Sequence, residues 1–189
     1  MRVTGGTARG RRLRVPSVDG LRPSTDRVRE TLFNVLGQQL DEVRVLDLFA
    51  GSGALGIEAL SRGAASCTFV ERDAVAARAL RENLEHTGTA ERADLVRADW
   101  RAALRRLRPA TEAYDLALID PPYGLDLGSE VLRELAAAGL MTPRGWFALE
   151  HASARPPVAP DGHECFRQLT MGSTTVSLFR RVEPEQDPC

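Results

Sequence analysis

The sequence contains no lysine, because all 25 of its basic residues are arginine. It has three cysteines, Cys67, Cys165 and Cys189, which lie far apart and lack the paired spacing of a metal site. Isolated thiols are typical of a reducing cytoplasm, so we expect neither a disulfide nor a bound metal. No apolar run reaches the roughly 18 residues of a membrane span, and the first residues lack the apolar stretch of a signal peptide. The sequence therefore predicts a cytoplasmic protein with no membrane partner.

The charge is unevenly distributed along the chain. The net charge of −1 by itself argues against a nucleic-acid-binding protein. Residues 1–37 nevertheless hold eight arginines against three acids, a net of +5, whereas the remainder holds 17 arginines against 23 acids. This pattern predicts one polyanion-facing surface, or else a solvated arm in an arginine-biased proteome. The arginines expected to contact a polyanion are Arg9, Arg11, Arg12, Arg22, Arg27 and Arg29.

The first part of the chain is predicted to be a basic extension. Residues 1–20 form this extension, with a short β-hairpin over residues 1–15 that is interrupted at Gly5-Gly6. Ser24 or Thr25 is expected to cap a helix whose apolar stripe contains Val28, Leu32, Val35 and Leu36. The main domain spans residues 21–182, and residues 183–189 form an acidic tail.

From residue 43 onward, strand patterns alternate with helix patterns, which predicts a parallel, doubly wound sheet. The final two apolar segments flank Met171-Gly172-Ser173, a spacing that favours an antiparallel hairpin. The fold class is therefore α/β, a Rossmann-like and mostly parallel sheet with a C-terminal antiparallel hairpin. The expected strands are residues 43–49, 66–70, 94–98, 114–119, 146–150, 165–170 and 174–180.

The segment Gly51-Ser52-Gly53-Ala54-Leu55-Gly56 matches the G-x-G-x-x-G pattern of nucleotide-cofactor sites. Glu71 follows Gly51 by 20 residues, at the end of the next predicted strand, where a carboxylate can accept hydrogen bonds from ribose hydroxyls. The pattern alone fits dinucleotide dehydrogenases and S-adenosylmethionine (AdoMet) enzymes equally. It also fits a glycine turn that only packs a strand against a helix.

Two acidic positions favour AdoMet over a dinucleotide. Asp47 precedes the glycines, where a negative charge would repel a pyrophosphate but suits the amino group of a methionine moiety. Asp99 can accept from the adenine amino group and Trp100 can stack on the ring, although Trp100 can equally be a half-buried core residue. The set expected to bind AdoMet is Asp47, Ala50, Gly51, Ser52, Gly53, Glu71, Arg72, Asp99 and Trp100.

The tetrapeptide Asp120-Pro121-Pro122-Tyr123 follows an apolar strand, at the edge where an open α/β sheet binds ligands. The lone pair of an exocyclic base nitrogen is delocalised into the ring. Acceptors at Asp120 and at the Pro121 carbonyl can hold its hydrogens and turn the lone pair toward a methyl donor. Pro122 biases Pro121 toward extended geometry, and Tyr123 can stack on the base. The alternative is a strand that simply ends in a proline turn.

Together these segments resemble the RsmD-type 16S ribosomal RNA guanine-N2 methyltransferases. The resemblance rests on residues 5–6, 9–13, 21–34, 47–63 and 120–123, of which residues 22–34 are the most specific to the family. It implies AdoMet as methyl donor, a guanine of small-subunit RNA as acceptor, and catalytic roles for Asp120, Pro121, Pro122 and Tyr123. The expected partner is 16S RNA in a partly or fully assembled small subunit, and the expected enzyme is a monomer.

Three other functions remain open at this stage. A DNA amino-methyltransferase shares the Asp-Pro-Pro-Tyr chemistry, but 189 residues leave no room for a target-recognition domain. A non-catalytic assembly factor would bind ribosomal RNA without needing Asp120 or the glycines. A nicotinamide oxidoreductase is disfavoured by Asp47.

Overall fold

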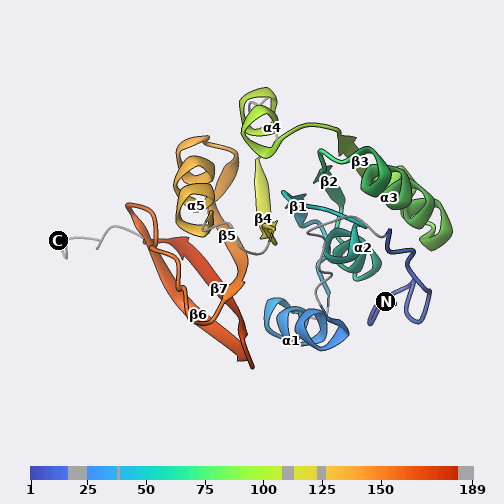
Figure 1. The fold of residues 1–189 in the computed structure, drawn as a ribbon, viewed down its shortest axis with the longest axis horizontal. Helices are drawn as coiled ribbons and strands as arrows, with labels where there is room; N and C mark the ends of the chain where they lie inside the picture. The colour runs from blue at the N-terminus through green and yellow to red at the C-terminus, as the bar shows by residue number, and fades with distance from the viewer. Residues whose placement is uncertain (17–24, 38, 108–112, 123–126, 183–189) are drawn as a thin grey trace.

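The computed structural model describes residues 1–16, 25–37, 39–107, 113–122 and 127–182. In this part of the chain, one seven-stranded sheet has the order β3-β2-β1-β4-β5-β7-β6 (Figure 1). The first five strands are parallel, and β7 is antiparallel to both of its neighbours. The predicted mixed sheet with a C-terminal hairpin is therefore confirmed. The strands are β1 Arg44–Asp47, β2 Ser66–Val70, β3 Ala93–Val96, β4 Tyr114–Ile119, β5 Met141–Ala152, β6 His163–Met171 and β7 Thr174–Arg181.

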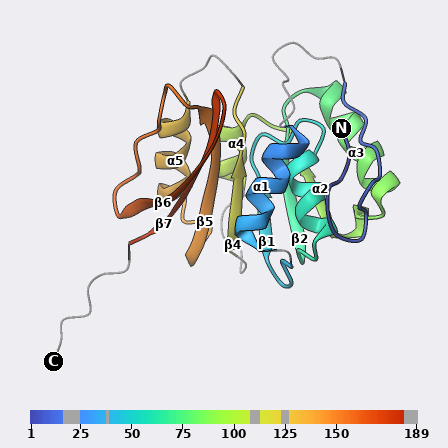
Figure 2. The ribbon, with the colours of Figure 1, turned by 90° about the horizontal axis from the view of Figure 1, so that it is seen from below.

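Helices cover both faces of the sheet (Figure 2). One apolar cluster joins α1, α2 and α3 to one face, and a second joins α4 and α5 to the other. None of the helices that the structure describes is long and apolar enough to span a membrane. The helices are α1 Asp26–Leu36, α2 Ala54–Ser61, α3 Ala74–Thr87, the 3-10 turn η1 Ala90–Arg92, α4 Trp100–Arg106 and α5 Gly128–Ala137.

The ends of two helices follow directly from their sequences. Thr25 caps α1 by accepting from Val28 N at 3.3 Å, as predicted. Asp73 caps α3 by accepting from two backbone N–H groups, and Gly88 ends it with φ 70°. These caps fix where each helix starts and stops beside the sheet.

Strand β5 is longer than the sequence predicts. We expected residues 146–150, whereas the strand runs over Met141–Ala152. Its final seven residues pair with β7, and its first residue pairs with Tyr114 before a register shift. The Met141–Tyr114 pair on the β4 side therefore carries the strand across Pro143 and Gly145, residues that locally favour a turn, while β7 extends the other end to Ala152.

In the N-terminal segment, residues 1–16, the predicted β-hairpin is reduced to one isolated antiparallel bridge, Arg2 to Arg12, without two strands. Val3 N donates to the Arg11 carbonyl and Leu13 N to the Met1 carbonyl, each at 3.0 Å. Between these residues the chain bonds to the end of α2 instead: Thr7 N donates to the Ser61 carbonyl at 2.8 Å, and Ala8 N to the Ser61 hydroxyl at 2.9 Å. The segment lies beside α2 and α3 in both views (Figures 1 and 2). It is packed against the domain, because Val3 is fully buried.

A buried ion cluster fastens this segment to α1 and α2. Glu58 of α2 accepts from Thr4 N and from Thr4 Oγ1, each at 2.8 Å, and from Arg62 Nε at 2.8 Å. Arg29 of α1 lies 4.0 Å from the same carboxylate and also donates to the Arg2 carbonyl at 2.6 Å. Because buried charges are stable only when they are paired, these contacts fix the segment in place.

Candidate cofactor and base site

The glycine turn joins the end of β1 to α2. Gly51 and Gly53 have φ of 54° and 83°, values that side chains rarely tolerate. A Cβ on Gly53 would lie 2.1 Å from Leu80 Cδ1, and one on Gly56 would lie 2.3 Å from Phe69 Cε1. Gly53 and Gly56 therefore allow the helix to pack closely against its neighbours. At these two positions, the interpretation of the motif as a turn that packs a strand against a helix is sufficient. Packing at these two positions leaves the backbone of Gly51 as the point for close ligand approach.

Asp47, at the carboxyl end of β1, is a buried carboxylate with only one oxygen satisfied. Its Oδ2 accepts from Gly56 N at 3.0 Å, whereas Oδ1 accepts no hydrogen bond from the described residues. Burial raises the pKa of Asp47 to about 7, and the negative charge of Glu71 adds to this effect. An unpaired buried acceptor is costly unless a ligand satisfies it. A protonated amino group is a suitable donor.

Glu71 connects the end of β2 to the glycine turn. Its carboxylate accepts from Gly51 N at 2.8 Å and from Asp73 N at 2.7 Å. An ionised carboxylate offers about four acceptor positions, so two remain for the hydroxyls of a ribose. The neighbouring Arg72 is exposed, while Ala50 and Ser52 are buried in the turn.

Trp100 lies largely in the core. It is 5% exposed beside α5, with the Arg101 guanidinium 4.2 Å from its ring centroid and Phe49 at 6.1 Å. These contacts favour the alternative of a core residue, and the stacking of Trp100 on adenine stays a prediction. Asp99 is exposed and caps α4 by accepting from Arg101 N at 3.0 Å.

Asp120 follows β4, which lies next to β1. The order of the strands reverses between β1 and β4, and ligands of open α/β sheets bind at such a switch point. Asp47 pairs with Leu118, whose side chain faces α1 and α2, and continuing the alternation places Asp120 on that same face. The Cα atoms of Asp47 and Asp120 are thus offset by about 7 Å along the strand direction, at one edge of the sheet.

The other residues of the tetrapeptide are described only in part. Asp120, Pro121 and Pro122 are half-buried. Tyr123 lies outside the described residues, so its stacking role stays a prediction. In the described part of the chain, no group of three or more His, Cys, Asp or Glu side chains is arranged to hold a metal ion.

Asn83 is a site residue that our sequence reasoning missed. It lies on α3 and is 2% exposed. Its Nδ2 donates to the carbonyls of Ser52 and Arg14, each at 2.9 Å, and its Oδ1 accepts from Arg14 N at 2.8 Å. A polar residue between Leu80 and Leu84 on the apolar face of a helix was the available sign of such a role.

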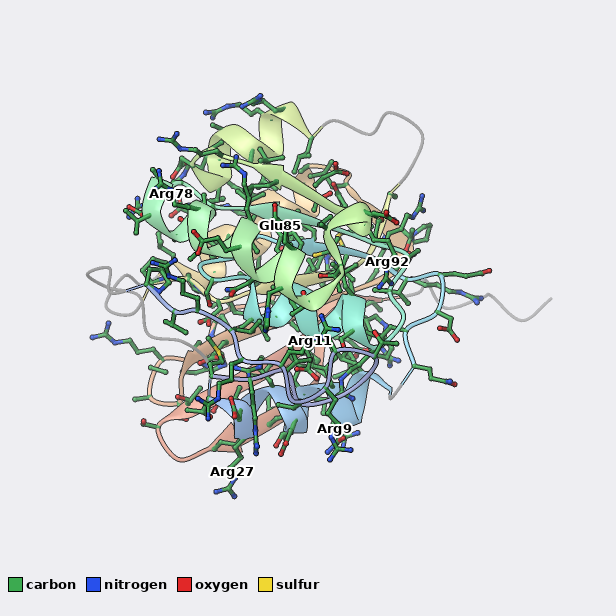
Figure 3. The ribbon with its side chains drawn as sticks, turned by 90° about the vertical axis from the view of Figure 1, so that its right-hand side faces the viewer. Arg9, Arg11, Arg27, Arg78, Glu85 and Arg92 are labelled. Carbon is green, nitrogen blue, oxygen red and sulfur yellow. The ribbon has the colours of Figure 1, made fainter. Side chains whose placement is uncertain are left out.

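The six arginines expected to contact RNA lie in different environments, and Figure 3 labels three of them, Arg9, Arg11 and Arg27. Arg9, Arg12 and Arg27 are exposed, and Arg9 and Arg27 project from the same edge of the view. The Arg11 side chain donates to the His86 carbonyl, and Arg22 lies outside the described residues. Arg29 is fully buried and pairs with Asp26 at 2.7 Å, so the prediction that it contacts RNA is wrong.

Comparison with known proteins identifies the family. The sequence profile of the family described as Conserved hypothetical protein 95 matches residues 1–180. The chain belongs to this family. It is 37% identical over 182 residues to Ribosomal RNA small subunit methyltransferase D of Escherichia coli K12, covering 96% of this chain and 90% of the relative. A protein of the same name from Haemophilus influenzae is 33% identical over 181 residues, with 95% and 93% covered.

Solved structures agree with this assignment. The structure of yhhF from Escherichia coli superposes with a TM-score of 0.82 at 34% identity, covering 97% of this chain and 99% of that one. The structure of SMU.776, determined with S-adenosylhomocysteine (SAH), gives 0.69 at 18% identity, with 86% and 50% covered, and shows a shared fold alone. The predicted RsmD-type family and its Rossmann-like methyltransferase fold are confirmed.

Proposed function

We propose that this protein transfers a methyl group from AdoMet to the exocyclic N2 amino group of a guanine in 16S ribosomal RNA. The observation that carries the proposal is the placement of Asp47, the glycine turn and Asp120 at one switch point of the sheet. The curated relatives named above act, by their names, on small-subunit ribosomal RNA. The bound SAH of SMU.776 supports AdoMet as the methyl donor for this fold.

The chain supplies a separate partner to each part of the cofactor. AdoMet, when bound, provides a methyl group made electrophilic by its sulfonium. The free Oδ1 of Asp47 accepts from the amino group of the methionine moiety, and Glu71 accepts from the ribose hydroxyls. Gly51 lets the backbone approach the ligand closely, with Ala50 and Ser52 as its neighbours in the turn. Asp99 is the exposed acceptor for the adenine amino group.

The base is held by the end of β4. Asp120 and the Pro121 carbonyl would accept hydrogen bonds from the two N–H bonds of the amino group, which would direct the nitrogen lone pair toward the methyl group. The new N–C bond would replace the S–C bond of the donor and leave SAH, and the nitrogen would lose one proton, which Asp120 can accept and pass to solvent. The contribution is positional, because the nucleophile needs orientation more than activation by a base. Pro122 restricts the backbone of Pro121, and Tyr123 stacks on the base. A base held in this way must leave its stack.

The substrate is 16S RNA within a partly or fully assembled small subunit, which the enzyme engages as a monomer in the cytoplasm. The acidic body of the enzyme repels RNA phosphates, so contacts with proteins of the particle add to the binding affinity. The exposed arginines of the N-terminal segment and α1 contact phosphates. The proposal is tested by tritiated methyl transfer from AdoMet to small subunits isolated from cells that lack this gene. Transfer to duplex DNA instead would identify a DNA methyltransferase, and RNA binding without any transfer would identify an assembly factor.

Replacing Arg9 and Arg12 together with Ala is expected to weaken RNA binding and its salt dependence. Each lost phosphate contact lowers the log–log salt slope by roughly 0.7–0.9. Binding to small subunits would be titrated at several salt concentrations. Point variants are needed because deleting the segment would also remove Val3 and Leu13 from the core.

The matched control is Arg144→Ala, which removes an exposed arginine near the amino end of β5, away from the site. This control should keep the wild-type slope. An Arg9/Arg12 variant that also keeps the wild-type slope would show that the N-terminal segment does not grip RNA.

Replacing Asp47 with Asn is expected to stabilise the free protein at pH 8 and to weaken AdoMet binding. The folded pKa of Asp47 is raised from 3.8 to about 7, so its charge lowers the free energy of unfolding as pH rises from about 4 to 7. Asn removes that cost, on the order of 4 kcal/mol at pH 8, and the gain should vanish near pH 4. Losing the charged acceptor should weaken AdoMet binding about tenfold to a hundredfold at pH 7.

Thermal unfolding and calorimetric titration measure the two effects. Between pH 5.5 and 7 the α-amino group of AdoMet stays protonated, so wild-type affinity should rise with pH as Asp47 ionises, while that of Asp47→Asn stays flat. The control Asp94→Asn removes an exposed acid from β3 and should change neither property. An Asp47→Asn protein with wild-type AdoMet affinity would exclude Asp47 from the cofactor site.

A further inference from the structure

One buried amide side chain connects the cofactor turn to the N-terminal segment. Asn83 Nδ2 has two hydrogens: one is donated to the Ser52 carbonyl and the other to the Arg14 carbonyl, each at 2.9 Å. Its Oδ1 accepts from Arg14 N at 2.8 Å, so this one amide holds both polar groups of the Arg14 backbone. Asn83 is 2% exposed, and water cannot replace these bonds without opening the helix–turn contact.

The turn that Asn83 contacts is the one that binds the cofactor. Ser52 lies between Gly51 and Gly53, whose positive φ values define the turn. Gly51 N donates to Glu71 on one side of the turn, and the Ser52 carbonyl accepts from Asn83 on the other. Any ligand that fixes the turn therefore also fixes the position of Asn83.

The segment that Asn83 holds carries proposed RNA contacts. Arg14 is the last residue of the stretch 4–14, which contains the exposed Arg9 and Arg12. The other end of this stretch is fixed on Glu58 and Ser61 of α2, the helix that begins directly after the turn. The RNA-facing segment is thus held at one end by Asn83 and at the other by α2, and both of these also contact the glycine turn.

We propose that Asn83 is a positioning residue that couples AdoMet binding to RNA binding, so that each ligand tightens the binding of the other. The proposal rests on the proposed function. Coupling between two sites is reciprocal, because the free energy gained by ordering the turn and the segment together is shared by both ligands. Asn83 contributes because its amide is bonded to both Ser52 and Arg14, so restricting the motion of Ser52 also restricts the backbone of Arg14.

The first test measures the binding of small subunits, isolated from cells that lack this gene, with and without saturating SAH. In the wild type, SAH should tighten binding about fivefold or more. In Asn83→Asp, which keeps the acceptor for Arg14 N but can donate neither to the Ser52 carbonyl nor to the Arg14 carbonyl, that factor should fall to about one. The control Glu82→Gln removes only the exposed ion pair between Glu82 and the Arg14 side chain, and should keep the coupling.

A purely structural role for Asn83 predicts a different result. Asn83→Asp would then unfold at a lower temperature while SAH still tightened particle binding by the wild-type factor, and this outcome would overturn the proposal. A loss of coupling in Glu82→Gln as well would show that the surface ion pair, not the amide, carries the effect. Methyl transfer by the wild type, measured in parallel, shows separately whether the proposed function holds.

The second test uses only the wild-type protein, so it does not depend on the folding of a variant. Hydrogen exchange is followed at single amides with and without SAH. The Arg14 amide, bonded to Asn83, should exchange at least several-fold more slowly when SAH is bound. The His163 amide, bonded to the Pro160 carbonyl at 3.0 Å and outside both the turn and the segment, is the internal reference. An Arg14 amide that responds no more than the His163 amide would refute the coupling without any use of RNA.

Discussion

Replacing Asp120 with Ala is expected to abolish methyl transfer while AdoMet affinity stays within about twofold of the wild-type value. Asp120 lies at the end of β4, two residues beyond Leu118, which pairs with Asp47 of the cofactor site. Its partner in the proposed mechanism is the amino group of the base, so its loss affects the base and not the cofactor. Removing one positioned group of this kind typically lowers kcat about 10²–10³-fold. Single-turnover transfer to unmethylated small subunits, together with calorimetric titration of SAH, measures both properties.

Two further variants sharpen this test. Asp120→Asn keeps the size of the side chain and one acceptor oxygen but removes the negative charge, so it should retain more activity than Asp120→Ala and less than the wild type. Asp115→Asn changes an acid at the opposite end of the same strand, where it accepts from Arg44 N at 2.9 Å, and should stay active. Full activity in Asp120→Ala would remove Asp120 from the catalytic site, whereas a large loss of SAH affinity would place it in the cofactor site.

The alternation of strands and helices was predictable because it depends on local periodicity. The predicted limits of β2 and β4 match the structure, since apolar residues end there at turns or at proline. The limits of β5 were not predictable from the local sequence. The residues that precede the expected start at residue 146 are held in the sheet by the pair with Tyr114, and the other end is extended by pairing with β7. Pairing with distant strands can override a local turn preference.

The roles of the charged residues in the N-terminal region were a second feature that the sequence could not predict. Counting arginines places eight of them in residues 1–37, but the count does not distinguish an exposed guanidinium from one that completes a buried ion cluster. Arg29 follows Val28 on the inner side of α1 and lies 4.0 Å from Glu58, 29 residues further along the chain. Only the fold brings such a partner into contact, so the buried role of Arg29 leaves no sign in the local pattern.

The cofactor site was predictable in position more than in detail. Asp47, the glycine turn and Glu71 gather at the switch point as the motif indicates. Trp100 is largely buried against Phe49 and Arg101, so its stacking on adenine stays a prediction. Asn83 was missed, since its partners Ser52 and Arg14 lie 31 and 69 residues away.

Gly6→Ala is expected to destabilise the whole domain by about 3 kcal/mol or more, the range of severe core substitutions. A Cβ at Gly6 would lie 1.8 Å from the carbonyl oxygen of Ser61, which belongs to the backbone of α2 and cannot rotate away. Relieving this overlap requires the segment to lift from the helix, which breaks the 2.8 Å bond from Thr7 N and exposes Val3. For a domain of this size, such a loss lowers Tm by roughly 6–12 °C.

Gly10→Ala separates this close contact from backbone strain. Gly6 and Gly10 have similar φ, 72° and 84°, but a Cβ on Gly10 meets nothing within 4 Å. Strain from the left-handed conformation alone costs about 1–2 kcal/mol, so Gly10→Ala should lower Tm by only a few degrees. Equal Tm losses in the two variants would mean that the N-terminal segment leaves α2 at little cost, and hence that it is an arm on the domain. If the segment is part of the core, calorimetry on the free protein should show a much larger loss of Tm for Gly6→Ala than for Gly10→Ala. The contacts of the segment with Ser61 and Glu58 would then unfold together with the sheet.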